Sequence, residues 1–252
     1  MKNNSVSLAI GLAAGLFGGL IGLGGGLIMI PLMISVLKFS QHQAHGTSLV
    51  ALIFTGIAGA LIYGLQGNID FLAAGSLSIT AIITARTGAY FANALPGWKL
   101  KRAFGAFLIF CAALMLIKPY LHETGIHHPL YVNILIFLMT GAATGFLSGM
   151  MGVGGGTIMV PAMVLLTGFG QHVAQGTSLL VMVPLGAAGA LAHHELGNVV
   201  KGFLPGLIPG IVLGAFLGGN IANFIPDTPL RLAFIAAIIF MGVSYARSKA
   251  PE

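Results

Sequence analysis

Long apolar stretches separated by short polar connections dominate the chain. Eight stretches can be distinguished, and most are near the roughly 20 residues that cross a bilayer as a helix. They cover residues 6–37, 47–65, 71–95, 103–117, 130–166, 177–192, 203–224 and 232–245. The first and the fifth are longer than one crossing needs, and three consecutive glycines interrupt each of them. The pattern predicts an all-α polytopic membrane protein in which these two segments are broken.

The two interruptions have nearly the same sequence. Residues 22–31 read G-L-G-G-G-L-I-M-I-P, and residues 152–161 read G-V-G-G-G-T-I-M-V-P. Each glycine costs about 1 kcal/mol relative to alanine inside a helix, so a triplet favours a break. Within a bilayer, the freed backbone groups must face protein, water or a ligand. The triplets are therefore either a binding site or points where neighbouring helices pack closely.

The second half of the chain repeats the first at a constant offset of 130 residues, without a gap. The block Q-H-Q-A-H-G-T-S-L at residues 41–49 corresponds to Q-H-V-A-Q-G-T-S-L at residues 171–179. Shared hydrophobicity alone would not align His, Gln, Thr and Ser in register. We therefore expect two homologous four-segment repeats, residues 1–125 and 126–252, that form one integrated unit. Internal repeats of this kind are typical of secondary transporters, whose sites lie between the repeats.

The positive charges bear on topology. If all eight stretches cross the membrane, the basic residues divide evenly between its two sides, five against five. If the two broken stretches re-enter, eight basic residues share one side and only Lys118 and Arg231 lie opposite, which follows the positive-inside rule. The eight are Lys2, Lys38, Lys99, Lys101, Arg102, Lys201, Arg247 and Lys249. This interpretation makes the repeats inverted relative to each other; a long, tilted helix is the alternative.

Composition excludes several classes of protein. With 57% hydrophobic and 6% charged residues, the chain does not have the composition of a soluble protein. The net charge of +6 comes from scattered residues that form no stripe, so nucleic-acid binding is not indicated. Cys111 is the single cysteine, and neither paired buried carboxylates nor a His-rich metal spacing is present. We therefore expect no enzyme activity, no metal and no cofactor.

Candidate binding groups cluster around the glycine triplets. A helix that starts at such a break presents free N–H groups and the positive end of its dipole, for which an anion is the natural guest. The N–H groups belong to Gly24, Gly25, Gly26, Gly154, Gly155 and Gly156. Nearby hydroxyls either cap the next helix or donate to an oxyanion; they belong to Thr47, Ser48, Thr177 and Ser178.

Arg86 is the one basic residue well inside an apolar stretch. Because a charge within the membrane is costly, it indicates either a functional role in attracting an anion or the satisfaction of backbone carbonyls. No carboxylate is placed comparably, since Asp70, Glu123, Glu195 and Asp227 all fall at segment ends. A cation pathway would lack its usual acidic ligands, and this also favours an anion.

The doubled G-x-G-G-G followed by Pro, the doubled G-T-S and the paired four-segment pattern resemble the sulfite exporter TauE/SafE family. The resemblance covers essentially the whole chain. It implies a multi-pass protein of the prokaryotic plasma (inner) membrane that moves small sulfur-containing anions such as sulfite, sulfoacetate or thiosulfate, often outward. The lipid bilayer and the anion are then its partners, and homo-oligomers are left open. An anion channel and a non-transporting membrane assembly factor are the alternatives.

Overall fold

The computed structural model describes residues 2–92, 97–117 and 129–247. Within these ranges the chain forms ten α-helices and one short 3-10 helix, and no strand. The helices are α1 (Lys2–Ile21), α2 (Gly26–Ser35), α3 (Gln41–Leu65), α4 (Phe71–Phe91), α5 (Gly97–Ile117), α6 (Leu130–Met151), α7 (Gly156–Leu166), α8 (Gln171–Glu195), η2 (Lys201–Phe203), α9 (Leu204–Phe224) and α10 (Asp227–Ala246). Lys118, Lys249 and the predicted boundary between residues 125 and 126 lie outside the described residues.

The fold class is confirmed: seven of the described helices are long and apolar enough to cross a membrane. The outer surface carries large apolar side chains such as Ile83, Leu213 and Phe240, which are 64%, 55% and 69% exposed. No Asp, Glu, Lys or Arg is buried among the residues whose side chains the structure describes, namely 4–92, 102, 104–117 and 129–247. This arrangement suits a protein surrounded by lipid, because exposed hydrocarbon costs nothing there.

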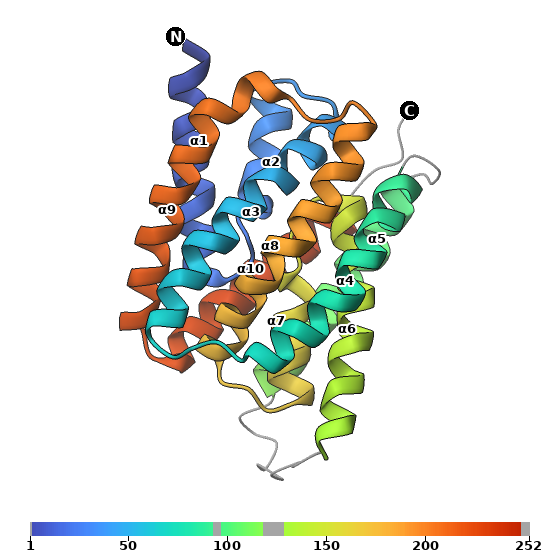
Figure 1. Cartoon of the computed structure of the whole chain (residues 1–252), viewed down its shortest axis with the longest axis vertical. Coiled ribbons are helices and arrows are strands. Elements are labelled where there is room, and N and C mark those ends of the chain that lie inside the picture. The colour runs from blue at the N-terminus through green and yellow to red at the C-terminus, as the bar shows by residue number, and fades with distance from the viewer. Residues whose placement is uncertain (1, 93–96, 118–128, 248–252) are drawn as a thin grey trace.

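The helix bounds follow the sequence repeat. The bounds of α3 and α8 differ by the same 130 residues at both ends, and α2 and α7 both start at the last glycine of their triplet. In the structure the two halves are interleaved (Figure 1): α1 runs along α9, α4 runs along α6, and α3 packs against α8. Neither half is a separate layer, which fits the expectation of one integrated unit.

Glycines allow the close approach of the parallel pairs α1/α9 and α4/α6. A Cβ at Gly11 would lie 2.4 Å from the carbonyl oxygen of Leu207, and one at Gly145 would lie 2.3 Å from that of Ala81. Backbones that touch in this way gain van der Waals contact where no side chain intervenes. The close-packing role considered for the triplets therefore belongs to these other glycines as well.

The two broken segments fold back on themselves. A Cβ at Gly25 would lie 2.4 Å from the carbonyl oxygen of Ala14, so α2 starts beside the middle of α1 and returns along it. Its far end lies near the start of α9, where Phe39 and Phe203 make an edge contact with ring centroids 5.4 Å apart. Figure 1 shows α1 and α2 running in opposite directions. This is the re-entrant arrangement that the charge count favoured.

The helices after the breaks begin earlier than the apolar pattern predicted. α3 starts at Gln41, where Ser40 is the N-cap and forms a capping box with Gln43. α8 starts at Gln171 after Gly170. The interpretation of Thr47, Ser48, Thr177 and Ser178 as helix caps is therefore wrong, because they lie in the second turn of α3 or α8. Polar residues before the apolar stretch extend each helix, since helix ends follow caps rather than hydrophobicity.

The re-entrant arrangement predicts the labelling of a matched pair of cysteines. Val36 and Leu166 occupy the same repeat position at the ends of α2 and α7 and are 57% and 50% exposed. In a Cys111→Ala background, we expect Val36→Cys to react with a membrane-impermeant thiol reagent from the same side as Asn4→Cys, and Leu166→Cys from the opposite side. Reaction of Val36→Cys from the side opposite to Asn4→Cys would contradict the fold-back.

The two triplets predict different responses to an added methyl group. Gly25 has a φ of 77° and faces backbone, whereas Gly155 has a φ of −80° and faces the side-chain ends of Met159 and Thr144. The left-handed backbone alone costs a residue with a Cβ about 1–2 kcal/mol. Thermal unfolding in detergent should therefore show a larger loss of stability for Gly25→Ala than for Gly155→Ala. An equal loss of stability in the two variants would contradict this prediction and would mean that the Met159 and Thr144 side chains cannot move away from the added methyl group.

Candidate functional site

Two short loops meet at the centre of the molecule. We call residues 22–25 the first loop and residues 152–155 the second loop; all eight are buried. A Cβ at Gly26 would lie 2.7 Å from the carbonyl oxygen of Val153, and one at Gly156 would lie 2.2 Å from that of Gly22. The loops thus contact each other through backbone alone, which only glycine permits. The structure therefore brings the six predicted glycines, Gly24–Gly26 and Gly154–Gly156, into one region.

Gly22 and Gly152 donate their N–H groups to Gly18 and Ser148, but the N–H groups that follow in each loop have no protein partners among the described residues. In the first loop and the start of α2 they belong to residues 23–27, and in the second loop and the start of α7 to residues 153–157. The next residues, Ile28 and Met29, donate to Gly25, and Ile158 and Met159 donate to Gly155. Buried N–H groups without a partner are rare and costly. Ten such groups at two helix N-termini form an environment suited to an anion.

The serines of the two G-T-S motifs hold the loops in place. Ser48 on α3 donates to the carbonyl oxygen of Gly152 at 2.7 Å, and Ser178 on α8 donates to that of Gly22 at 3.0 Å. Both side chains are fully buried. Each serine also lies within hydrogen-bond distance of a carbonyl one turn earlier in its own helix. Their hydroxyl protons are directed at the main chain, so in this structure they position the loops.

The threonines of the same motifs anchor the connections between helices. Thr47 accepts a hydrogen bond from the N–H of Val200 at 3.1 Å, and Thr177 accepts one from the N–H of Asp70 at 3.0 Å. These contacts repeat at the 130-residue offset and cross from one half of the chain to the other. Of the four predicted hydroxyls, the two serines therefore contact the loops and the two threonines bond to the connections between helices.

Two further residues cap the broken helices where they end. The Tyr63 hydroxyl lies 3.3 Å from the Gly19 carbonyl oxygen near the end of α1, and His193 Nε2 lies 2.9 Å from the Gly149 carbonyl oxygen near the end of α6. Both carbonyls lack a helical partner at a helix C-terminus. His193 donates to the Gly149 carbonyl, whereas the single Tyr63 proton is shared between the Gly19 carbonyl and the nearer Oε1 of Gln175 at 2.8 Å. Tyr63 and His193 occupy the same repeat position, but sequence reasoning missed them because their chemistry differs. Their spacing of 130 was the available signal.

The structure also reveals buried polar groups that the sequence reasoning did not single out. Thr144 and Ser148 on α6 are 0% and 3% exposed, and neither hydroxyl has a partner in the described residues. Gln175 on α8 is fully buried; its Oε1 accepts from Tyr63 at 2.8 Å, but its Nε2 has no partner there. Thr144 lies against Gly155, and Gln175 against Gly22. The available signal was a pair of hydroxyls four residues apart, hence on one helix face, directly before the second triplet.

Arg86 does not lie at the loops. Its side chain is 62% exposed and pairs with Glu195 at 3.3 Å, while Tyr90 donates to the same carboxylate at 2.6 Å. Glu195 ends α8, seventeen residues beyond Ser178, which is about 25 Å along a helix. Arg86 therefore ties α4 to the end of α8. The structure keeps this predicted site residue apart from the glycine loops.

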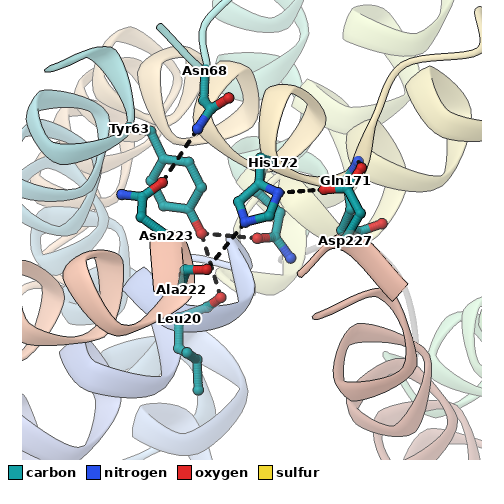
Figure 2. A network of polar contacts seen from close by, with 9 residues as sticks. Leu20, Tyr63, Asn68, Gln171, His172, Ala222, Asn223 and Asp227 are labelled. Atoms are coloured by element: carbon teal, nitrogen blue, oxygen red, sulfur yellow. Dashed lines mark hydrogen bonds and ion pairs between the residues drawn. The ribbon is translucent and has the colours of Figure 1, made fainter. Parts of the chain in front are cut away.

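A polar network closes the end of the molecule where α8 begins (Figure 2). His172 contacts the Asp227 carboxylate through Nδ1 and lies 3.1 Å from the Ala222 carbonyl oxygen through Nε2. Asn68 donates to Asn223 at 3.2 Å beside it. The network links α8, α9, α10 and the connection after α3. The His172 ring also lies near the ring of Tyr63, a residue of α3 whose hydroxyl lies beside the end of α1. No group of described His, Cys, Asp and Glu residues forms a metal site.

Comparison with known proteins agrees with this architecture. The family model described as "Sulfite exporter TauE/SafE" matches residues 7–245. The chain is 29% identical over 216 residues to the "Probable membrane transporter protein YunE" of Bacillus subtilis, covering 77% of this chain and 79% of that protein. It is 25% identical over 231 residues to the "Probable membrane transporter protein YdhB" of the same organism, covering 91% and 94%.

A similar relative occurs in an archaeon. The "Probable membrane transporter protein MJ0441" of Methanocaldococcus jannaschii is 25% identical over 198 residues, covering 76% of this chain and 72% of that protein. No solved structure matches significantly. The match to the family model extends across both broken segments and both G-T-S motifs. A multi-pass helical architecture, the two crossed glycine loops and this match lead to one assignment: the chain is a membrane transporter of the TauE/SafE family.

Proposed function

We propose that this protein is a secondary transporter that exports small sulfur-containing anions, such as sulfite, sulfoacetate or thiosulfate, across the prokaryotic plasma membrane. The observation that carries the proposal is the set of ten N–H groups, on buried residues where the two loops meet, that have no partner in the described part of the chain. The substrate passes through unchanged, because the proposed site offers hydrogen-bond donors and no reactive group.

The anion in this proposal is held by dipoles. Among the described residues no charged Lys or Arg is buried, so the positive potential comes from the N-termini of α2 and α7. A hydrogen bond to a charged group contributes about 1.5–3 kcal/mol, and several such bonds offset the loss of the anion's water. A site without a fixed full charge also releases its ligand readily, which a carrier requires.

The proposed transport includes alternating access, in which the site opens first toward the start of α8 and then toward its end. Toward the start of α8, the first loop lies behind Tyr63, Gln175 and the His172–Asp227 pair. Toward the end of α8, the second loop lies behind His193. Movement of one half of the molecule against the other would open one end while the other stays closed. The loops, held by Ser48 and Ser178, remain between the two ends.

Exchange in proteoliposomes tests transport. Labelled sulfite should enter vesicles that contain unlabelled sulfite in a saturable manner and faster than it enters empty vesicles, because a carrier returns more quickly when loaded. Protein-free vesicles are the control. Flux that rises linearly with concentration and is not stimulated from the far side would instead indicate an anion channel. Absence of flux for sulfite, thiosulfate and sulfoacetate alike would overturn the substrate assignment.

A cross-link tests the proposed opening beside the start of α8. Asn68 and Asn223 are in hydrogen-bond contact at 3.2 Å and belong to different repeats. In a Cys111→Ala background, oxidation of the Asn68→Cys, Asn223→Cys variant should reduce exchange at least about tenfold, and a reductant should restore it. The single-cysteine variants under the same oxidant are the controls. Full exchange with a disulfide verified by mass spectrometry would show that this end does not open there.

A further inference from the structure

The two loops are not equivalent, although the sequence repeats. At three positions around the second loop the chain carries hydroxyls where the first repeat has apolar residues or glycine. Thr144 corresponds to Ala14, Ser148 to Gly18 and Thr157 to Leu27 at the offset of 130. All three hydroxyl side chains are at least 97% buried. The second loop therefore has three buried hydroxyls beside it that the first loop lacks.

Two of these hydroxyls lack partners in the described part of the chain, namely those of Thr144 and Ser148. The third, on Thr157, has only a long contact of 3.5 Å with the Gly154 carbonyl oxygen. A buried hydroxyl without a partner costs free energy, and Thr80, Thr84 and Ser76 on neighbouring α4 all donate to backbone carbonyls instead. Such groups persist in a core when a ligand uses them.

Thr144 borders the N-terminal start of α7, and the sequence repeat indicates the same side of α6 for Ser148. The nearest contacts of a Cβ placed at Gly155 would include the Thr144 methyl at 2.7 Å. A Cβ at Gly18, the repeat equivalent of Ser148, would lie 2.6 Å from the backbone nitrogen of Gly25, which corresponds to Gly155. Ser148 lies one turn after Thr144 on the same face of α6, and its repeat position is that of Gly18, so we expect its side chain on the side of α6 that packs against the start of α7.

The atoms around the two loops also differ in how easily they can move. At Gly155 the neighbouring atoms are the ends of the Met159, Thr144 and Leu185 side chains. At Gly25 they are the Ala14 backbone and Cβ. Flexible side-chain ends can move aside for a ligand, whereas backbone cannot. The second loop is therefore the one that can accommodate an anion at its N–H groups.

We propose that the anion binds asymmetrically, on the second loop at the N-terminus of α7, where the hydroxyls of Thr144 and Ser148 donate to its oxygens together with the N–H groups of residues 155–157. This assignment rests on the proposed transport of sulfur oxyanions and specifies where they bind. Two hydroxyls and a row of N–H groups match a ligand with several terminal oxygens on one centre. The first loop has one comparable donor, Nε2 of Gln175, and serves mainly as the packing partner.

Direct binding of sulfite to the purified full-length protein tests the assignment. Thr144→Val and Ser148→Ala remove the hydroxyls with little change in volume. Loss of a hydrogen bond to a charged ligand should raise the Kd for sulfite about tenfold for each variant. At the same time the melting temperature without ligand should stay the same or rise, because a buried hydroxyl without a partner is removed. A residue with only a structural role would lower both stability and binding.

Matched controls come from α4 and α8. Thr84→Val and Ser76→Ala remove hydroxyls that are bonded to the backbone, and they should leave the Kd within about twofold. Gln175→Leu removes the donor at the first loop. If Gln175→Leu raises the Kd while Thr144→Val and Ser148→Ala do not, the anion binds at the first loop and the assignment is overturned.

The same experiment separates the two proposals. An unchanged Kd in Thr144→Val and Ser148→Ala, with sulfite binding intact in the unaltered protein, overturns only the asymmetric site. Failure of the unaltered protein to bind sulfite, thiosulfate or sulfoacetate overturns the proposed substrate class and the asymmetric site with it.

Discussion

Backbone hydrogen bonding is the constraint on which the rest of this structure depends. In a membrane, a helix that stops halfway leaves donors and acceptors that lipid cannot satisfy. The chain breaks two helices and then resolves each broken end differently. The carbonyls at the ends of α1 and α6 are capped by Tyr63, His193, Ser48 and Ser178. The N–H groups at the starts of α2 and α7 have no such partners in the described chain. The carbonyl oxygens of Gly19, Gly22, Gly149 and Gly152 thus have side-chain partners, whereas the ten N–H groups have none among the described residues.

This division gives the centre of the molecule its electrostatic character. Capped carbonyls contribute little negative potential, while free N–H groups contribute a positive one. The proposed site would thus favour negative charge without any buried Lys or Arg among the side chains that the structure describes. Arg86, the one basic residue within an apolar stretch, does not contribute to this potential, because it pairs with Glu195 at the end of α8.

Much of the architecture could be predicted from the sequence because its signals are local or periodic. Glycine triplets predict breaks, the constant offset predicts corresponding helices, and the distribution of Lys and Arg predicted that the broken arms return to their own side. The starts of α3 and α8 were misplaced because capping by Ser40 and Gly170, rather than hydrophobicity, sets them. Partners distant in sequence could not be predicted. The contacts of Ser178 with Gly22 and of Arg86 with Glu195 join residues more than a hundred positions apart, and the isolation of Thr144 and Ser148 is visible only once every neighbour is placed.

The exchange of contacts between the halves has a consequence for biosynthesis. The first loop is fixed by Ser178, and α1 packs along α9, so the earliest helix depends on the latest part of the chain. During insertion, α1 and α2 are in the membrane before α8 and α9 have been made, so the hydrogen bond from Ser178 to Gly22 cannot yet form. A ribosome makes about 5–20 residues per second, so this interval lasts on the order of ten seconds or more. The N-terminal half is therefore the part most exposed to premature degradation or to pairing with the wrong helix. Its native contacts can form only when the second half has entered the bilayer.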